Sequence, residues 1–159
     1  MSSSHPTNRY QPSLEEQVFI LILRAADYFG QQTEEMLKPH WLTSTQYNVL
    51  RILRGAGQEG LPCKSVGCRM ISHDPDMTRL LDRMEKRGLI ARERQKDDRR
   101  VVKARITPAG LEILKKLDSP VREFHKAKFA HFSATKLKQL AELLGECQKP
   151  APKESSDAS

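Results

Sequence analysis

Residues 88–110 read GLIARERQKDDRRVVKARITPAG, and this stretch decides the fold. Leu89 to Arg94 and Val101 to Ile106 are short runs with alternating apolar residues, which is typical of strands, and the polar QKDDRR between them is typical of a turn. From Lys86 to Arg105 the chain has nine Lys or Arg and three acidic residues, so this segment carries +6 of the formal net charge of +7. A charge so localised indicates a binding surface for a polyanion.

A helix with a basic outer face is predicted directly before this ribbon. Asp74 is expected to cap the helix, Pro75 to occupy its first position, and Gly88 to end it. Its buried side should consist of Met77, Leu80, Leu81 and Met84. Its outer side carries Asp76, Arg79, Asp82, Arg83 and Lys86. Such a helix followed by a basic ribbon suits a DNA duplex, because the helix fits the major groove while the ribbon reaches phosphates or the neighbouring minor groove.

Helices are predicted over most of the remaining chain. Residues 14–37 have helical spacing with an unusually wide apolar face. Thr43 and Gln46 form a capping box at the start of the next helix, and Pro62 opens a short one. Together with the two-stranded ribbon, these helices place the protein in the mainly α class with a small sheet (α+β).

Two further helices are predicted toward the C-terminus. Thr107, followed by a proline, begins the first of them, which Pro120 is expected to kink or restart. Ser133 caps the second, whose inward residues are expected to be Leu137, Leu140, Leu143 and Leu144. The apolar faces of these helices and of the first helix exceed what a small core can bury, so a second copy of the chain is expected to cover them.

Length and composition restrict the class of protein. The 159 residues fit one compact domain, and residues 1–13 and 148–159 contain too little apolar surface to order, so both are expected to be disordered. No window approaches the roughly 18 consecutive apolar residues of a membrane span, and the N-terminus lacks a secretory pattern. Three cysteines without dense spacing fit a reducing compartment. We therefore expect a cytoplasmic protein that binds no membrane.

The sequence resembles the MarR-type (multiple antibiotic resistance regulator) family of winged-helix transcriptional regulators. LTSTQYNVLRIL is similar to the family's second helix, DMTRLLDRMEKRGLI to its recognition helix, and DDRRVVKARITPAG to its wing and the start of its fifth helix. Three motifs occur in the family's order and spacing: T-R-L-L-D-R-x-E-x-R-G-L, the D-x-R of Asp98 and Arg100, and the I-T-x-x-G of Ile106 to Gly110. The resemblance covers residues 14–147.

This resemblance implies a winged helix-turn-helix protein whose N- and C-terminal helices form a dimerisation domain. The DNA-reading lobe would span residues 43–107, and the dimerisation helices residues 14–37 and 108–147. It also implies a homodimer that binds a pseudo-palindromic operator in double-stranded DNA as a ligand-responsive repressor, with recognition helices ~34 Å apart. In the family, the two residues of the D-x-R hold and aim the wing, roles carried here to Asp98 and Arg100.

The residues expected to contact DNA fall in two groups. In the major groove they are Thr78, Arg79, Arg83 and Asp76. On the wing and backbone they are Arg94, Lys96, Asp98, Arg99 and Arg100. Asp76 departs from the family pattern, in which this helix often begins with Ser or Thr. Two interpretations of Asp76 remain open: it accepts a hydrogen bond from a cytosine, or it stabilises the helix N-terminus together with Asp74. Arg92 and Arg105, near the base of the ribbon, are the expected exceptions among its cations.

A small-molecule site and a redox site are the other candidates. Tyr28, Phe29, His40 and Trp41 lie at the junction of the first two predicted helices, where aromatic or phenolic effectors act in the family; packing of that junction is the alternative interpretation. Cys63 follows Pro62 in the first turn of a helix, whose N-terminus lowers a thiol pKa and suits redox sensing. An ordinary small core thiol is the alternative for Cys63.

No enzyme, cofactor or metal site is predicted. The chain has no glycine-rich phosphate loop, no nucleophile elbow and no H-E-x-x-H motif. Two functions of other kinds remain as alternatives to the ligand-responsive regulator: a sequence-indifferent, architectural nucleic-acid-binding protein and a cysteine-based redox-sensing regulator. The first is disfavoured by the lack of aromatic residues between Lys86 and Arg105 for base stacking.

Overall fold

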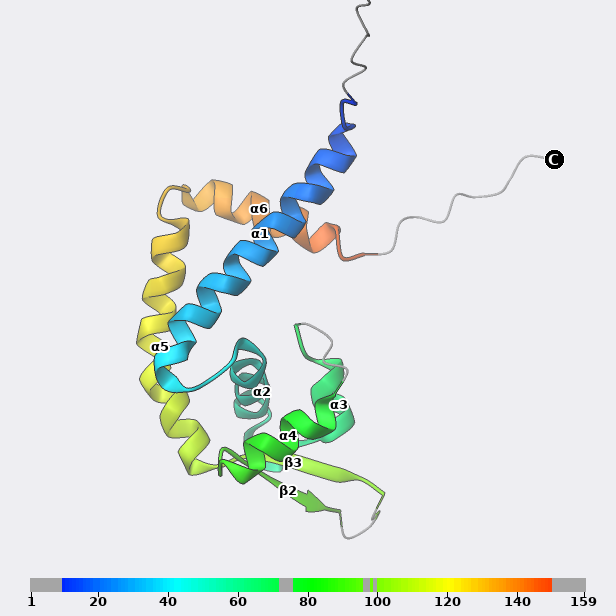
Figure 1. The fold of residues 1–159 in the computed structure, drawn as a ribbon, viewed down its shortest axis with the longest axis vertical. Coiled ribbons are helices and arrows are strands. Elements are labelled where there is room, and N and C mark those ends of the chain that lie inside the picture. The colour runs from blue at the N-terminus through cyan, green and yellow to red at the C-terminus, as the bar shows by residue number, and fades with distance from the viewer. Residues whose placement is uncertain (1–9, 72–75, 96–97, 99, 150–159) are drawn as a thin grey trace, which may run out of the picture. The chain divides into compact units, whose positions relative to one another are not determined.

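The computed structural model describes residues 10–71, 76–95, 98 and 100–149, and it is mainly helical with a small antiparallel sheet (Figure 1). The chain divides into two compact units, Met1–Lys115 and Lys116–Ser159. The elements of the first unit, in chain order, are α1 (Leu14–Leu37), η1 (Lys38–His40), α2 (Ser44–Gly55), η2 (Gly57–Glu59), β1 (Leu61–Pro62), α3 (Cys63–Cys68), α4 (Met77–Lys86), β2 (Ile90–Arg94) and β3 (Val102–Ile106). Helix α5 (Pro108–Phe129) begins in the first unit and ends in the second, which also contains α6 (Ala134–Glu146).

Helix α1 is long and leaves most of its apolar residues uncovered in the single chain. Ser13 caps it by accepting a hydrogen bond from the backbone N–H of Glu16. Leu37 is its one buried residue. The exposed apolar residues are Leu14, Val18, Phe19, Leu21, Leu23 and Tyr28. The wide apolar face expected for residues 14–37 is therefore present, and little of it is used within one copy.

The core of the first unit lies between α2, α4 and the sheet. The capping box expected at Thr43 and Gln46 is confirmed, because each side chain bonds the other residue's backbone. Helix α4 lies beside the β2–β3 ribbon (Figure 1). The fully buried side chains of this core are Leu37, Val49, Leu50, Leu53, Val66, Leu80, Leu81, Met84 and Ile90.

The sheet has three strands in the order β1-β3-β2, all antiparallel. The predicted ribbon is confirmed, with Arg92 opposite Ala104 in its register. The first strand was not predicted: Leu61 also pairs with Ala104, just before Pro62 starts the short helix. Gly60 permits this approach, because its φ of 63° is in the left-handed half of the Ramachandran map, where other residues are strained.

Helix α4 begins two residues later than the sequence indicates. Its N-cap is Asp76 and its first residue is Met77. The predicted cap at Asp74 and the proline at position 75 lie outside the described residues. Its C-cap is Arg87, and Gly88 follows with a φ of 70°, so the predicted stop is confirmed.

In the single chain, the C-terminal helices differ from two expectations: the restart that was the alternative to a kink at Pro120, and the inward position of two leucines of α6. Helix α5 does not restart at Pro120 but continues through it to Phe129, with Leu117 and Val121 buried on either side of the proline. Packing of flanking residues outweighs the hydrogen bond that a proline removes. Leu143 and Leu144 of α6 are not inward, since their exposed fractions are 61% and 39%.

Candidate nucleic-acid interface

The outer face of α4 presents cations to solvent. Arg79, Arg83 and Lys86 are exposed, and Thr78 is exposed beside them. The opposite face is buried through Leu80, Leu81 and Met84. A helix with one buried and one cationic face leaves its charged side free to enter a groove of a duplex.

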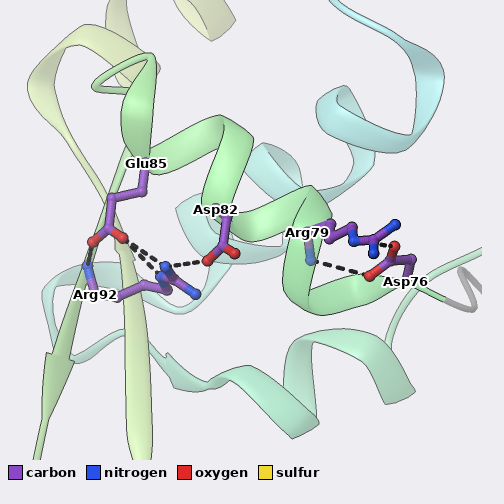
Figure 2. A network of polar contacts seen from close by, with 5 residues as sticks. All are labelled: Asp76, Arg79, Asp82, Glu85 and Arg92. Carbon is purple, nitrogen blue, oxygen red and sulfur yellow. Dashed lines mark hydrogen bonds and ion pairs between the residues drawn. The ribbon is translucent and has the colours of Figure 1, made fainter.

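Asp76 and Arg79 interact at the start of this helix. The Oδ1 atom of Asp76 accepts a hydrogen bond from the backbone N–H of Arg79 at 3.3 Å, and its Oδ2 atom lies 3.2 Å from the Nε of Arg79 (Figure 2). The Arg79 side chain remains 78% exposed. Asp76 therefore acts as a helix cap, which is the second of its two sequence-based interpretations, and it orients the base of an otherwise accessible arginine.

The described part of the wing is organised by Asp98. Its Oδ1 atom accepts a hydrogen bond from the backbone N–H of Arg100 at 3.0 Å, and its backbone carbonyl accepts one from Val101 at 3.0 Å. Arg94 and Arg100 are exposed. Lys96 and Arg99, also expected to contact DNA, lie outside the described residues. Asp98 thus shapes the wing through the backbone of Arg100 and leaves the arginine side chain outside that turn.

Arg92 joins the wing to α4. Its Nε and Nη2 atoms donate to the Oε2 atom of Glu85 at 3.0 and 2.7 Å, and Nη2 also bonds Asp82 (Figure 2). Its backbone N–H donates to the Oε1 atom of Glu85 at 3.0 Å. The hydrogen bonds that Arg92 donates to Glu85 raise the pKa of Arg92 above its ordinary value. Asp82 and Glu85, which the sequence places on an ordinary mixed-charge surface, are in fact acceptors in this clamp of Asp82, Glu85 and Arg92.

Other basic side chains of the segment are also occupied within the lobe. Arg105 pairs with Glu93 across the β2–β3 ribbon. Arg87 donates to the Oε1 atom of Gln46 at 3.0 Å, tying the end of α4 to the start of α2. The expectation that Arg92 and Arg105 differ from the other ribbon cations is consistent with these pairings. Among the described residues, Arg79, Arg83 and Lys86 of α4 and Arg94 and Arg100 of the wing remain exposed.

The junction of α1 and α2 contains further polar contacts. The Oε1 atom of Glu34 accepts hydrogen bonds from the backbone N–H of Ser44, at 2.8 Å, and from its hydroxyl. Gln46, with only 8% of its surface exposed, bonds both the backbone of Thr43 and Arg87. The first turn of α2 is therefore attached to α1 on one side and to the end of α4 on the other. No sequence pattern indicates the contact of Glu34, because its partner lies ten residues away across an irregular connection.

One of the predicted aromatic ligand residues lines a hollow at the junction of α1 and α2. A hollow of about 290 Å³ lies at this junction, lined by Glu34, Glu35, Lys38, Trp41, Leu42 and Thr43. Trp41 is 84% exposed, whereas Tyr28 and Phe29 contact each other edge to face, with ring centroids 5.4 Å apart. Of the four candidates, Trp41 alone is in the lining of this hollow.

The surroundings of Cys63 do not favour the activation expected for its thiol. Burial raises the pKa of its thiol above the ordinary value, and this effect exceeds the opposing influence of Arg92. The residue lines a mostly apolar hollow with Met77, Leu81 and Val102, whose lining also includes Lys64, Thr78 and Arg92. Burial therefore opposes the lowering of the thiol pKa that the helix N-terminus was expected to cause.

Cysteine labelling should follow this order of reactivity. At neutral pH, iodoacetamide is expected to modify the exposed Cys68 and Cys147 before Cys63, as measured by peptide mass spectrometry over time. Because the thiolate of Cys63 forms only as the pH approaches a raised pKa, its labelling rate should climb as the solution is made more alkaline. Preferential labelling of Cys63 at neutral pH would revive the redox-sensing hypothesis.

The described residues contain neither a group of metal ligands nor a helix able to span a membrane. In the ranges that the structure describes, no three His, Cys, Asp or Glu side chains gather as metal ligands. Among the described helices, none has the length and apolarity needed to cross a bilayer.

Comparison with known proteins agrees with this geometry. The profile of the MarR family matches residues 42–102. The HTH-type transcriptional regulator TtmR of Methylorubrum extorquens is 35% identical over 113 residues, which are 70% of this chain and 57% of TtmR, so the chain spans little more than half of that relative. The homoprotocatechuate degradative operon repressor of Escherichia coli is 27% identical over 133 residues, 84% of this chain and 88% of the repressor.

A solved structure extends the similarity to the whole fold. The crystal structure of a MarR transcription factor from Planctomyces limnophilus matches with a TM-score of 0.66 at 36% sequence identity, covering 86% of this chain and 99% of that one. The winged helix-turn-helix topology that the family resemblance of residues 14–147 implied is thereby confirmed. On the combined strength of the sequence motifs, the fold and these relatives, the chain belongs to the MarR family of winged-helix transcriptional regulators.

Proposed function

We propose that this protein is a homodimeric repressor that binds a specific pseudo-palindromic operator in double-stranded DNA. The observation that carries the proposal is a set of exposed cations on one lobe: Arg79, Arg83 and Lys86 on α4, with Arg94 and Arg100 on the attached wing. Helix and ribbon together match the groove and backbone of a duplex. Repression is favoured because the Escherichia coli relative, which aligns over most of its length, is a repressor.

The exposed apolar residues of both units support a dimer. In the first unit they include Phe19, Leu21 and Leu23 of α1, and in the second Leu143 and Leu144 of α6. Exposed leucine and phenylalanine at this density are unusual for a monomeric protein and typical of a surface covered by a partner. We assign that role to residues 14–37 and 108–147, and DNA reading to residues 43–107.

Each of the predicted contact residues has a proposed role. Thr78, Arg79 and Arg83 would contact base edges, with Asp76 acting as the cap that orients Arg79. The phosphate and minor-groove contacts would come from Arg94, Lys96, Arg99 and Arg100, with Asp98 bonding the backbone of Arg100. Direct readout by arginine in the major groove supplies specificity, and the wing cations supply affinity.

Selection of a binding site tests this function. Duplexes would be selected from fragments of the source genome, and the best one compared with its scrambled version by fluorescence anisotropy at several salt concentrations. Preference of about 100-fold or more for the selected duplex, saturating at one dimer per pseudo-palindrome, supports the proposal. Equal affinity for both, weakening together as salt rises, would instead establish the sequence-indifferent binder.

Substituting Arg79 should separate base readout from phosphate binding. Arg79→Ala is expected to cost about 1–3 kcal/mol on the selected duplex and to relax specificity at one base pair. Lys96→Ala serves as the comparison, because loss of a phosphate contact should weaken the selected and scrambled duplexes alike. Anisotropy titrations of both variants on both duplexes measure the difference. A uniform loss for Arg79→Ala would reassign that arginine to the backbone.

A second proposal concerns a small effector at the junction of α1 and α2. An exposed Trp41 beside a hollow of about 290 Å³ provides an aromatic surface, and the Escherichia coli relative is named for an operon that degrades an aromatic acid. The lining carries Glu34 and Glu35 against the single cation of Lys38, so electrostatics favours a phenol over a strongly anionic ligand. Calorimetry with phenols and aromatic acids, on the wild type and Trp41→Ala, tests the site; binding that the substitution leaves unchanged would place the effector elsewhere.

A further inference from the structure

The clamp of Asp82, Glu85 and Arg92 is the polar connection between α4 and the wing. Arg92 belongs to β2, an edge strand in the order β1-β3-β2, and its backbone N–H points away from β3 to Glu85. Its side chain is only 22% exposed, while those of Asp82 and Glu85 are 41% and 37% exposed. One arginine thus engages two residues that are three positions apart on one face of α4 (Figure 2).

The geometry of this clamp is more restrictive than that of an ordinary surface ion pair. Glu85 accepts through both oxygens, one from the backbone and one from the guanidinium of Arg92, so both the strand and the side chain are positioned. Multiple charge-assisted hydrogen bonds from a planar guanidinium define an orientation, whereas a single exposed pair defines little. The base of the wing is therefore held in one position relative to the cationic face of α4.

The clamp also changes the charge that a duplex meets. Asp82 and Glu85 lie on the same helix as Arg79 and Arg83, and two unpaired carboxylates there would repel phosphate. Arg92 compensates part of that negative charge from within the lobe, and its pairing leaves the exposed cations of α4 and the wing to face solvent.

We propose that Arg92 is a positioning residue that makes α4 and the wing act as one rigid reading unit. The inference rests on the proposed DNA binding, and it assigns Arg92 no contact with DNA. When two contacting elements are rigidly connected, engagement of the first places the second against its target at high effective concentration. When the connection loosens, the second contact must be ordered at its own entropic cost, and its contribution falls.

A double-mutant cycle on the selected duplex tests this role. In the wild type, removal of the exposed wing side chain by Arg100→Ala is expected to reduce affinity about tenfold. In the Arg92→Lys background, which keeps the charge but cannot reproduce the forked hydrogen bonds, the same removal should cost less than about threefold. Arg83→Ala, on α4 itself, should carry the same penalty in both backgrounds.

Arg105→Lys provides the matched control. It disturbs a comparable arginine–carboxylate pair of the same ribbon, with Glu93, and neither member of this pair bonds α4. The penalty of Arg100→Ala should therefore remain about tenfold in the Arg105→Lys background. Thermal unfolding monitored by circular dichroism would verify that each variant is folded at the titration temperature.

The outcomes separate this inference from the function on which it rests. An undiminished penalty of Arg100→Ala in folded Arg92→Lys would overturn the positioning role while leaving DNA binding intact. Failure of the wild type to select any duplex would overturn both. If Arg92→Lys does not fold, Glu85→Gln replaces it, since the amide still accepts the backbone hydrogen bond of Arg92 but lacks the charge. The same reduction in the Arg100→Ala penalty is expected in this background. An unchanged penalty refutes the positioning role of Arg92.

Discussion

Replacing Gly60 with alanine is expected to lower the free energy of unfolding by about 3 kcal/mol. The loss has two causes: the backbone of Gly60 lies in a region that is nearly exclusive to glycine, and an added methyl group would be overpacked. Gly60 has φ 63° and ψ −166°. A Cβ atom placed there would lie 2.4 Å from the backbone carbonyl oxygen of Ala104, which cannot move without disturbing β3. The substitution should therefore separate β1 from β3 and weaken the sheet that supports the wing. Urea unfolding followed by circular dichroism measures the loss.

Two other glycines distinguish the sources of this effect. Gly57 has a similar φ of 66° but nothing within 4 Å of the added Cβ, so Gly57→Ala should cost only about 1–2 kcal/mol through backbone strain. Gly110 lies in α5, where an added Cβ would meet the carbonyl oxygen of Leu89 at 2.4 Å, so Gly110→Ala tests steric overlap in a helical backbone. Equal losses at positions 57 and 60 would show that the close approach to Ala104 contributes nothing.

The Leu21→Glu variant is expected to be monomeric and to lose affinity for the selected duplex by about 100-fold or more. Leu21 is 61% exposed in the single chain, so the substitution removes little packing inside one copy. In a dimer formed through α1, each copy would bury an unpaired carboxylate against the other, which is strongly unfavourable. A monomer has one DNA-reading lobe, so it lacks the increase in affinity that comes from binding two half-sites at once. Sedimentation and anisotropy measure the two effects.

Ile71→Glu is the matched control for this change. Ile71 is 91% exposed and lies after α3, remote in sequence from α1, so the same exchange of an exposed apolar side chain for a carboxylate should leave the oligomeric mass unchanged. Leu14→Glu, at a residue that is 71% exposed and lies seven positions before Leu21 on the same face of α1, provides a second disruption. A dimeric mass for both α1 variants would remove residues 14–37 from the proposed interface.

Local patterns were sufficient to predict much of this fold. The capping box of Thr43 and Gln46, the glycine after α4 and the alternating runs of the ribbon are signals spanning a few residues, and each appears where expected. The resemblance of residues 88–110 to a wing then linked these elements into one topology, which the relatives confirm. The DNA-contact and effector residues stay predictions.

Contacts between distant segments were not predictable in the same way. Nothing in the spacing of Glu85 and Arg92 distinguishes a clamp from two solvated charges, because the pairing depends on where β2 passes α4. Strand β1 was missed since a pair of residues has no periodicity, and Pro62 indicated a helix start, which it also provides. The pKa of Cys63 was misjudged because burial, which no local pattern reveals, outweighs the helix terminus.

The exposure of Trp41 gives the molecule a built-in optical reporter. It is the only tryptophan in the chain, and it stands 84% uncovered between α1 and α2 with a left-handed backbone conformation. Its emission therefore comes from one place, next to the turn where Glu34 bonds Ser44. Any event that covers or displaces this junction, including assembly of two copies or occupation of the neighbouring hollow, will register in the fluorescence of the unlabelled protein without the introduction of a dye.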